Sequence, residues 1–342
     1  MKRHNRLKKH TLGLAAALLM TAGMSQIALA GDSVYVNTSS LRYRTSAQIK
    51  DNNIAGNLSY GQKLERVTSK KPASAGAVQT TSQTAAGAQT SGGTAIALSS
   101  NYKYANYSKI NSGTASLYRS TASNKKNKVV CVNAGHGTNG GGSVKTQCHP
   151  DGSAKVTGGT TGAGATSAVA VSSGMTFADG TAESKVTLAM AKVLKTKLLN
   201  AGYDVLMIRE SDDVQLDNIA RTVIANNNAD CHIALHWDST SSNKGAFFMS
   251  VPSNATYRAM EPVASHWKQH NQLGESLISG LKSAGVKIYS KGSMEMDLTQ
   301  TSYSTIPSVD IELGDKASDH SGATLETLAN GLLAGVNTFF GQ

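Results

Sequence analysis

Two histidines and two glutamates, far apart in the sequence, occupy positions where their side chains could act together chemically. His136 follows an apolar run in the sequence NAGHG, and His236 comes directly after a second such run. Glu183 opens a helical pattern, and Glu312 lies in the last apolar segment. Ligands of open α/β sheets bind at the carboxyl ends of the strands, and all four residues fall at that edge. We therefore expect the four side chains to converge.

Two histidines and one carboxylate, with water in the fourth position, form the ligand set of a catalytic zinc hydrolase. Each residue taken alone has a simpler explanation. The sequence Gly-His-Gly is common in turns, His236 could be a structural histidine, and Glu183 could merely favour the positive end of a helix. Glu312 could lie on a solvated strand edge. Together, in this order and at these element ends, the four residues favour a metal site.

The segments that carry these residues alternate between strand and helix patterns. Continuous apolar runs, typical of strands buried on both faces, predict strands at 129–132, 205–208, 231–235, 246–251, 286–289 and 308–313. Apolar positions three and four residues apart predict helices at 183–200, 216–224, 273–282 and 325–339. This alternation predicts the α/β fold class, with a mostly parallel twisted sheet and helices on both faces.

A long segment without strong periodicity, residues 139–181, separates His136 from Glu183. It is rich in Gly, Thr and Ser. Loops longer than about 12–15 residues inside a compact domain are usually functional or disordered. We expect this segment to be a lid or a substrate-side loop that adds little to the core, so that shortening it leaves folding intact.

The first thirty residues have the composition of a targeting segment. The basic start MKRHNRLKKH is followed by a short apolar run and by Ala28-Leu29-Ala30. This order is typical of a secretory signal peptide, cleaved here before Gly31. The alternative is a membrane anchor, but the apolar run is shorter than the ~20 residues that span a bilayer. We expect a protein secreted to the extracellular space or cell wall, with no membrane association after cleavage.

The composition narrows the possible partners. The 342 residues include 33 Lys and Arg and 22 Asp and Glu, which gives a net charge of +11. Residues 1–30 carry five of the basic side chains and no acidic ones, so the remainder has 11 − 5 = +6. A mildly basic chain suits an anionic cell surface, but this charge is too diffuse to indicate nucleic-acid recognition.

The cysteines and the remaining histidines point to structural roles. Three cysteines rule out a disulfide-dense small domain. Cys131 and Cys231 are expected to be buried thiols, with a disulfide as the alternative, and Cys148 has no assigned partner. His232 is expected in the core. The two histidines of the sequence HWKQH are expected on a solvated helix face, with metal binding as the alternative.

Residues 31–122 are expected to form a separate β domain. Turn glycines and short apolar patterns indicate strands in 33–67, and residues 69–99 are a low-complexity insertion without aromatic or acidic side chains. The segments VYVNTSSLRYRTSAQ and YSKINSGTASLYRSTAS resemble the first and last strands of a bacterial SH3-like cell-wall-binding domain. The alternative is a generic β segment that binds nothing. Residues 123–127 are expected to be a linker.

Five motifs follow one another in residues 128–342, in the order VNAGHGTNGG, AESKVTLAMAKVLKTKLLNAGYDV, IRESDDVQLDNIARTVIANNNAD, IALHWDS and DIELG. On these motifs the region resembles the zinc-dependent N-acetylmuramoyl-L-alanine amidases of the amidase-3 type. The resemblance implies that His136, Glu183 and His236 bind Zn²⁺ and that Glu312 is the catalytic carboxylate. It also implies peptidoglycan as the partner, and we expect the protein to act as a monomer.

The activity implied by this resemblance is cleavage of the amide between N-acetylmuramic acid and L-alanine by a zinc-activated water. Two alternatives remain. A zinc peptidase could use the same site on the stem peptides of peptidoglycan, and a non-catalytic wall-binding protein could keep the amidase fold without activity. The four intact site residues favour an enzyme over a non-catalytic protein.

Several positions depart from the family pattern. After the last glutamate, residues 315–319 (DKASD) replace the aromatic residue and the Ser-Asn pair of the family. Asn133 stands where the family has Asp, which changes the support of the first histidine. Trp237 and Asp238 replace a small residue and Asn after the second histidine. Asp310 replaces an apolar residue and faces the same side as Glu312. We expect this like charge to raise the pKa of one of the two carboxyl groups.

Overall fold

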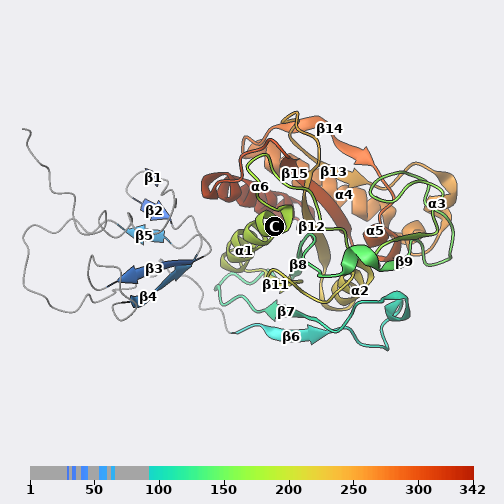
Figure 1. Ribbon diagram of the computed structural model, residues 1–342, viewed down its shortest axis with the longest axis horizontal. Coiled ribbons are helices and arrows are strands. Elements are labelled where there is room, and N and C mark those ends of the chain that lie inside the picture. The colour runs from blue at the N-terminus through green and yellow to red at the C-terminus, as the bar shows by residue number, and fades with distance from the viewer. Residues whose placement is uncertain (1–28, 31–32, 36–39, 45–53, 60–62, 66–91) are drawn as a thin grey trace, which may run out of the picture. The chain divides into compact units, whose positions relative to one another are not determined.

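The computed structural model describes residues 29–30, 33–35, 40–44, 54–59, 63–65 and 92–342 (Figure 1). The chain divides into two compact units, residues 1–79 and 80–342. The expected signal peptide lies almost entirely outside the described residues, as does most of the low-complexity segment. Within the described ranges, no helix has both the length and the apolar character needed to cross a membrane.

The described part of the N-terminal unit consists of two small antiparallel sheets. β1 (Leu29–Ala30), β2 (Ser33–Tyr35) and β5 (Lys63–Glu65) form the first. β3 (Ser40–Arg44) and β4 (Ile54–Ser59) form the second. An SH3-like barrel in this region stays a prediction.

The C-terminal unit is built on a mixed eight-stranded sheet with the strand order β14-β13-β15-β12-β8-β11-β7-β6 (Figure 1). The strands are β6 (Thr94–Ala97), β7 (Thr114–Tyr118), β8 (Val129–Ala134), β11 (Asp204–Met207), β12 (Cys231–Asp238), β13 (Ala246–Ser250), β14 (Ile288–Glu295) and β15 (Ser308–Asp315). The central strands β11, β8, β12 and β15 run parallel, and β7 and β13 flank them antiparallel. The α/β prediction is therefore confirmed, with a sheet that is parallel at its centre.

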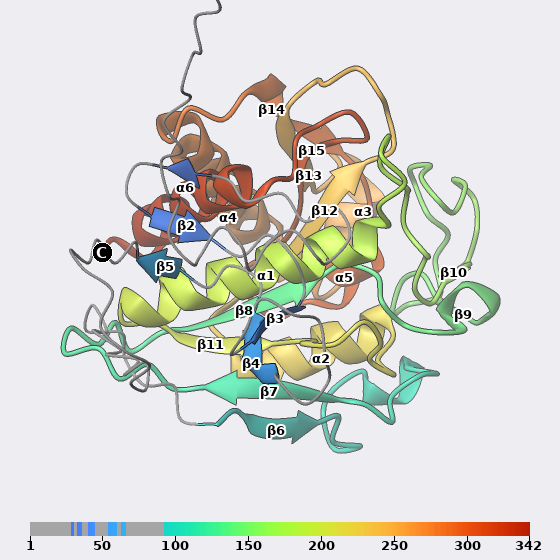
Figure 2. The same cartoon turned by 60° about the vertical axis from the view of Figure 1, so that its left-hand side comes forward.

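Six α-helices of the described chain cover this sheet. They are α1 (Glu183–Asn200), α2 (Asn218–Asn228), α3 (Ala255–Ala259), α4 (Val263–Ser283), α5 (Thr299–Tyr303) and α6 (Gly322–Phe340). α2 packs on Cys131, Leu206 and Ile208, whereas α1, α6 and α4 lie next to one another (Figure 2). α4 and α6 approach closely because glycines meet at their contact: a Cβ on Gly280 would lie 2.2 Å from the carbonyl oxygen of Gly331.

The helix boundaries show where an apolar repeat in the sequence predicts the start of a helix correctly and where it does not. α1 begins at Glu183 and ends at Asn200, as predicted from its apolar repeat. α4 starts at Val263, well before the predicted helix. Its first turns bury only Val263 and His270 before Leu273, so they produce no apolar repeat that could mark a helix.

Strands β6 and β7 correct the predicted domain boundary. β7 pairs with β11, with Tyr118 opposite Val205, and β6 pairs with β7. Residues 107–123, predicted to be the last strands of an SH3-like domain, therefore carry a strand of the large sheet. Ala115 of β7 is fully buried in a cluster with Leu206. The prediction fails because a short alternating strand has the same local pattern in either kind of sheet.

The long segment 139–181 is more structured than its sequence predicts. Within it, β9 (Lys145–Gln147) and β10 (Ser167–Val169) form an antiparallel pair. Its buried side chains include Cys148, His149, Val171 and Phe177. The prediction that this segment adds little core is therefore wrong. Its interior mixes polar and apolar side chains, so an apolar repeat does not reveal it.

The buried cysteines and histidines mostly follow the predictions. All three cysteines are buried free thiols, which rules out the alternative of a Cys131–Cys231 disulfide. His232 is fully buried, as expected of a core histidine. The prediction of a solvated position is wrong for His270, which is 2% exposed. Its Nδ1 accepts a hydrogen bond from the backbone N–H of Ser308 at 3.0 Å.

Candidate metal centre

Three of the four predicted site residues meet at the carboxyl edge of the central strands. Nε2 of His136 lies 2.9 Å from Oε1 of Glu183 and 3.0 Å from Nδ1 of His236. That Nδ1 lies 3.2 Å from the same Oε1. One ligand atom from each residue lies within 4.8 Å of the other two, which is close enough for all three to hold one metal ion.

The turn that carries His136 has an unusual backbone conformation. The φ angle of His136 is 63°, in the left-handed region that non-glycine residues rarely adopt and that occurs often at functional sites. Nδ1 of the ring lies 2.9 Å from the carbonyl oxygen of Ser172. A donor on Nδ1 leaves the lone pair of Nε2 directed toward Glu183 and His236. The long segment 139–181 thus orients the first histidine.

Two glycines leave room for the histidine rings. A Cβ on Gly135 would lie 2.2 Å from Cε1 of His236, and a Cβ on Gly174 would lie 2.7 Å from Cδ2 of His136. Gly174 also has a φ of 82°, which residues with a side chain rarely adopt. A side chain at either position would displace a histidine of the site.

Glu183 is the first residue of α1, and two backbone N–H groups from other parts of the chain fix its carboxylate. Its Oε1 accepts from the N–H of Trp237 at 3.0 Å, and its Oε2 accepts from the N–H of Met175 at 2.8 Å. Burial alone would raise the pKa of Glu183, but hydrogen bonds with His136 and His236 outweigh this effect and hold the pKa well below its usual range. The side chain is therefore a carboxylate, the form that binds metals.

Two buried arginines support the His136 turn, and neither of them is among the site residues predicted from the sequence. Arg221 donates from Nη2 to the carbonyl oxygen of His136 at 2.7 Å. Arg209 donates from Nη2 to the carbonyl oxygen of Gly135 at 2.8 Å. Burial lowers the pKa of Arg209 to about 10 and that of Arg221 to about 9. The signals in the sequence are that both lie in the motif IRESDDVQLDNIARTVIANNNAD and that Arg209 directly follows a buried strand.

Asn133, one of the departures from the family pattern, supports the site indirectly. It is 5% exposed, and its Oδ1 accepts a hydrogen bond from Nη1 of Arg221 at 3.1 Å. Because an amide carries no charge, this contact holds the guanidinium of Arg221 in place without neutralising it.

Glu312 and Asp310 project from β15 beside His236. In the register of β12 and β15, His236 pairs with Glu312. Oδ2 of Asp310 lies 3.7 Å from Nε2 of His236. Burial raises the pKa of Glu312 well above its usual range, and the like charge of Asp310 raises it further, as the sequence predicts. Burial would lower the pKa of His236, but Asp310, Glu183 and Glu312 raise it to about 10.

This set of donors suits a divalent cation. The carboxylate of Glu183 faces both histidines, and its negative charge favours a positive ion between them. Imidazole nitrogens and a carboxylate oxygen are accepted ligands of Zn²⁺. Among the residues that the structure describes, three protein ligands converge, which leaves a further coordination position open, as in catalytic rather than structural zinc sites.

The three side chains line a cavity of about 520 Å³, a size typical of small-molecule sites. Asp310 and Glu312 line it as well, together with Lys155, Thr160 and Thr161 of the segment 139–181. Its apolar lining includes Met249, Met294 and Met296. The long segment therefore forms part of the cavity wall, and its role as a substrate-side loop stays a prediction.

The comparison with protein families assigns the chain to one of them. Residues 130–330 match the family described as N-acetylmuramoyl-L-alanine amidase. This range spans more than half of the chain and contains both histidines and both glutamates of the site. The chain therefore belongs to the N-acetylmuramoyl-L-alanine amidase family. No curated protein matches it.

Solved structures of amidases resemble the chain as well. The N-acetylmuramyl-L-alanine amidase Ami1 from Mycobacterium smegmatis has a TM-score of 0.51 and 17% identity, over 63% of this chain and 97% of that chain. An N-acetylmuramoyl-L-alanine amidase from Clostridium difficile 630 has a TM-score of 0.44 and 16% identity, over 63% of this chain and 97% of that chain. AmiC2 of Nostoc punctiforme has a TM-score of 0.44 and 15% identity, over 64% and 99%. At 17% identity, the similarity to Ami1 concerns the fold.

Proposed function

We propose that this protein hydrolyses the amide between N-acetylmuramic acid and L-alanine in peptidoglycan, with a Zn²⁺ ion held by His136, Glu183 and His236. The observation that carries this proposal is the convergence of the three side chains in one cavity with Glu312. Membership of the amidase family supports the class of substrate.

The contacts of the ligands support their proposed roles. The atoms that face one another are Nε2 of His136, Oε1 of Glu183 and Nδ1 of His236. Bound there, Zn²⁺ would polarise the scissile carbonyl and lower the pKa of a water molecule toward ~7. The hydrogen bond from Nδ1 of the first histidine to the carbonyl oxygen of Ser172 and the one from the N–H of Trp237 to the glutamate hold both ligands in position beforehand, so little rearrangement is needed.

Glu312 is the proposed proton carrier. It would accept the proton of the attacking water and return it to the leaving nitrogen of L-alanine, which yields a carboxyl group and a free amine. Among the described residues, Oε2 of Glu312 has no hydrogen-bond partner. That oxygen is therefore available to the reacting groups, whereas both oxygens of Glu183 are occupied.

The experiment that tests this proposal measures metal content and the bond that is cleaved. The purified protein is expected to contain about one zinc ion per chain, and to release peptides that begin with L-alanine from muropeptides. Mass spectrometry of the products identifies the bond. Cleavage between residues of the stem peptide would indicate a zinc peptidase. Zinc and wall binding without hydrolysis would indicate a non-catalytic protein.

We also propose that the protein is secreted, acts on the cell wall as a monomer and begins at Gly31. The composition of residues 1–30 supports this proposal. The N-terminal unit is proposed to add affinity for the wall, and the C-terminal unit to carry the chemistry. Sequencing the N-terminus of secreted protein tests the cleavage, and a start upstream of Leu12 in the membrane fraction would show an anchor. Sedimentation of the mature protein tests the monomer.

A further inference from the structure

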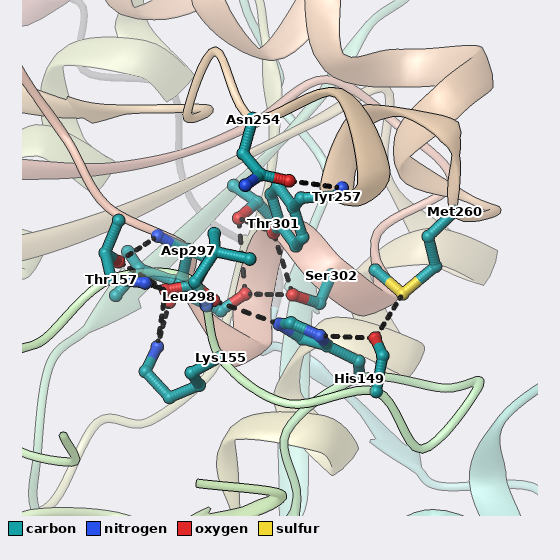
Figure 3. Close-up of polar contacts among 12 residues, drawn as sticks. His149, Lys155, Thr157, Asn254, Tyr257, Met260, Asp297, Leu298, Thr301 and Ser302 are labelled. Carbon is teal, nitrogen blue, oxygen red and sulfur yellow. Dashed lines mark hydrogen bonds and ion pairs between the residues drawn. The ribbon is translucent and has the colours of Figure 1, made fainter. Parts of the chain in front are cut away.

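A second polar cluster, separate from the metal-binding side chains, is centred on Asp297 (Figure 3). Asp297 lies between β14 and α5 and is fully buried. Its carboxylate accepts from Nζ of Lys155 at 2.9 Å, from Nε2 of His149 at 3.1 Å and from the backbone N–H of Val156 at 2.7 Å. The N–H of Thr157 donates to it at 3.2 Å, and the hydroxyl of Thr157 also donates to it. One side chain thus gathers four residues of the segment 139–181.

The backbone of Asp297 takes part in the same cluster. Its N–H donates to Oγ1 of Thr157 at 2.9 Å, and its carbonyl oxygen accepts from Lys155. Burial would raise the pKa of Asp297, but its hydrogen bonds with His149, Thr157 and Lys155 hold the pKa well below the usual range. The group is therefore a buried carboxylate paired with a buried ammonium and several neutral donors, which is the condition under which burying charge is tolerated.

The cluster also reaches the elements around it. Nδ1 of His149 lies 2.9 Å from Oγ of Ser153, and the ring of His149 lies 5.0 Å from that of Tyr257. The hydroxyl of Tyr257 forms a hydrogen bond with that of Ser302 at 2.8 Å. Through these contacts the segment 139–181 is joined to α3 and α5, as Figure 3 shows.

The residues held by Asp297 continue directly into the wall of the cavity. Lys155 lines the cavity, as do Thr160 and Thr161 a few residues further on. Met296, the residue before Asp297, lines it as well. A Cβ on Gly159 would lie 3.1 Å from Sδ of Met296, so the two wall segments are in close contact. Asp297 therefore lies just behind the wall and fixes both of its segments.

The order Ser153, His149 and Asp297 resembles that of a hydrolytic triad. The remaining contacts of Asp297 favour a different role, because its oxygens also hold Lys155 and Thr157. Among the residues that line the described cavity, Ser153 is not found. The geometry therefore favours positioning of the wall over a second nucleophile.

We propose that Asp297 is a positioning residue of the substrate site, which holds residues 155–161 as a preformed wall for the part of the muropeptide beyond the scissile amide. The inference rests on the proposed amidase function. The wall sequence contains Gly158, Gly159 and Thr160, which lose much conformational freedom when they are ordered. An anchor that orders them before the substrate binds removes this cost from binding. Asp297 is therefore predicted to act on substrate affinity and not on the chemical step.

The first test compares Asp297→Asn with Asp230→Asn as a matched control. Asp230 also pairs with a lysine, Lys128, at 2.9 Å and accepts a backbone N–H at 2.7 Å, but at the opposite end of the strands. For a muropeptide substrate, Asp297→Asn is expected to raise KM roughly tenfold and to change kcat by less than about twofold, because only preformed binding is lost. Zinc content and the pH profile of kcat are expected to stay unchanged. The control should alter neither KM nor kcat.

Two further variants keep the test valid if Asp297→Asn does not fold because Lys155 is left unpaired. The double variant Lys155→Gln with Asp297→Asn removes both charges and keeps hydrogen-bonding groups. Thr157→Val removes one hydroxyl and keeps the shape of the side chain. Both are expected to raise KM in the same direction. Hydrogen exchange of the Val156 and Thr157 amides should become faster, which reports on the wall independently of activity.

The outcomes separate this inference from the proposed function. If the wild-type protein binds zinc but does not cleave muropeptides, the proposed function fails. Calorimetric binding of the same muropeptide then tests the wall, and weaker binding by Asp297→Asn would still support it. The inference is overturned if the folded variants show faster amide exchange in residues 155–161 while their KM or binding constant equals that of the control. A fall in kcat with unchanged KM would overturn it as well.

Discussion

At the scale of single residues, Glu183 and Glu312 show how two buried glutamates acquire different properties. Both oxygens of Glu183 accept backbone N–H groups, and its pKa lies well below the usual range. Burial raises the pKa of Glu312, and among the described residues its Oε2 has no hydrogen-bond partner. Two carboxyl groups whose surroundings move their pKa values apart are suited to separate tasks. The contacts therefore favour Glu183 as a fixed anion and Glu312 as the group that exchanges protons.

Replacing Glu312 by Gln tests this division of roles. The amide has nearly the same shape but cannot take a proton from water, so kcat is expected to fall by ~10²–10⁴ while zinc stays bound. His136→Ala is the comparison, because removal of one of only three ligands should release the metal. Zinc content by atomic absorption and kcat on muropeptides are the two measurements. A zinc-bound Glu312→Gln protein with full activity would contradict the proposed mechanism.

The space around the histidines gives a second prediction. A Cβ on Gly135 would lie 2.2 Å from His236, whereas a Cβ on Gly142 would meet no atom within 4 Å. Gly135→Ala is therefore expected to displace the ring of His236 and to weaken zinc binding by at least about tenfold, the effect of disturbing a ligand's support. Gly142→Ala, the matched control, should bind zinc like the wild type. Competition with a chelator measures both affinities, and equal values would refute the steric argument.

At the scale of elements, the parts that could be predicted from the sequence are those with a simple apolar pattern. His136, Glu183 and His236 could be predicted as site residues because each lies at the end of a strand or the start of a helix whose apolar residues are visible in the sequence. Arg221 and Asp297 have no such marker. Both are charged residues whose partners lie far away in the chain, such as the carbonyl of His136, and only the fold brings those partners together.

The edge strands β6 and β7 could not be assigned to the large sheet from the sequence either. They lead to a prediction about which fragment of the chain folds. Because β7 pairs with β11 and β6 pairs with β7, residues 92–342 contain the whole large sheet, whereas residues 125–342 lack two of its strands. The longer fragment is expected to be soluble and to cleave muropeptides. The shorter one should expose the edge of β11 and aggregate, since unpaired edges recruit other chains. Light scattering and activity of the two fragments provide the test, and a soluble, active 125–342 fragment would show that the two strands are dispensable.

At the scale of the whole molecule, the buried ionisable groups determine how stability depends on pH. Burial lowers the pKa of His232 and that of His270 to about 3. In the unfolded chain a histidine has a pKa of about 6.5, so below this pH the unfolded state binds protons that the folded state does not. These two histidines therefore lower the stability progressively as the pH falls from about 6.5 toward 3. Asp297, whose pKa is depressed, adds a loss only below the ordinary pKa of about 3.9 for an aspartic acid.

A comparison of the wild type with a variant that lacks one of these histidines isolates that histidine, because the other buried groups, among them Glu312 with its raised pKa, contribute equally to both proteins. In zinc-free protein between pH 4 and 6, each buried neutral histidine should contribute a slope of up to about 1.4 kcal/mol per pH unit to the free energy of unfolding. His236, whose pKa is raised to about 10, is protonated in both states there and adds no slope. Within the described structure, neither ring nitrogen of His232 has a hydrogen-bond partner, so His232→Leu leaves no donor or acceptor unpaired. Urea unfolding is expected to show a slope that is lower than that of the wild type by up to about 1.4 kcal/mol per pH unit for this variant, and a more stable protein at pH 5, whereas at pH 8 the difference should be small. An unchanged slope would mean that His232 is already protonated in the folded protein.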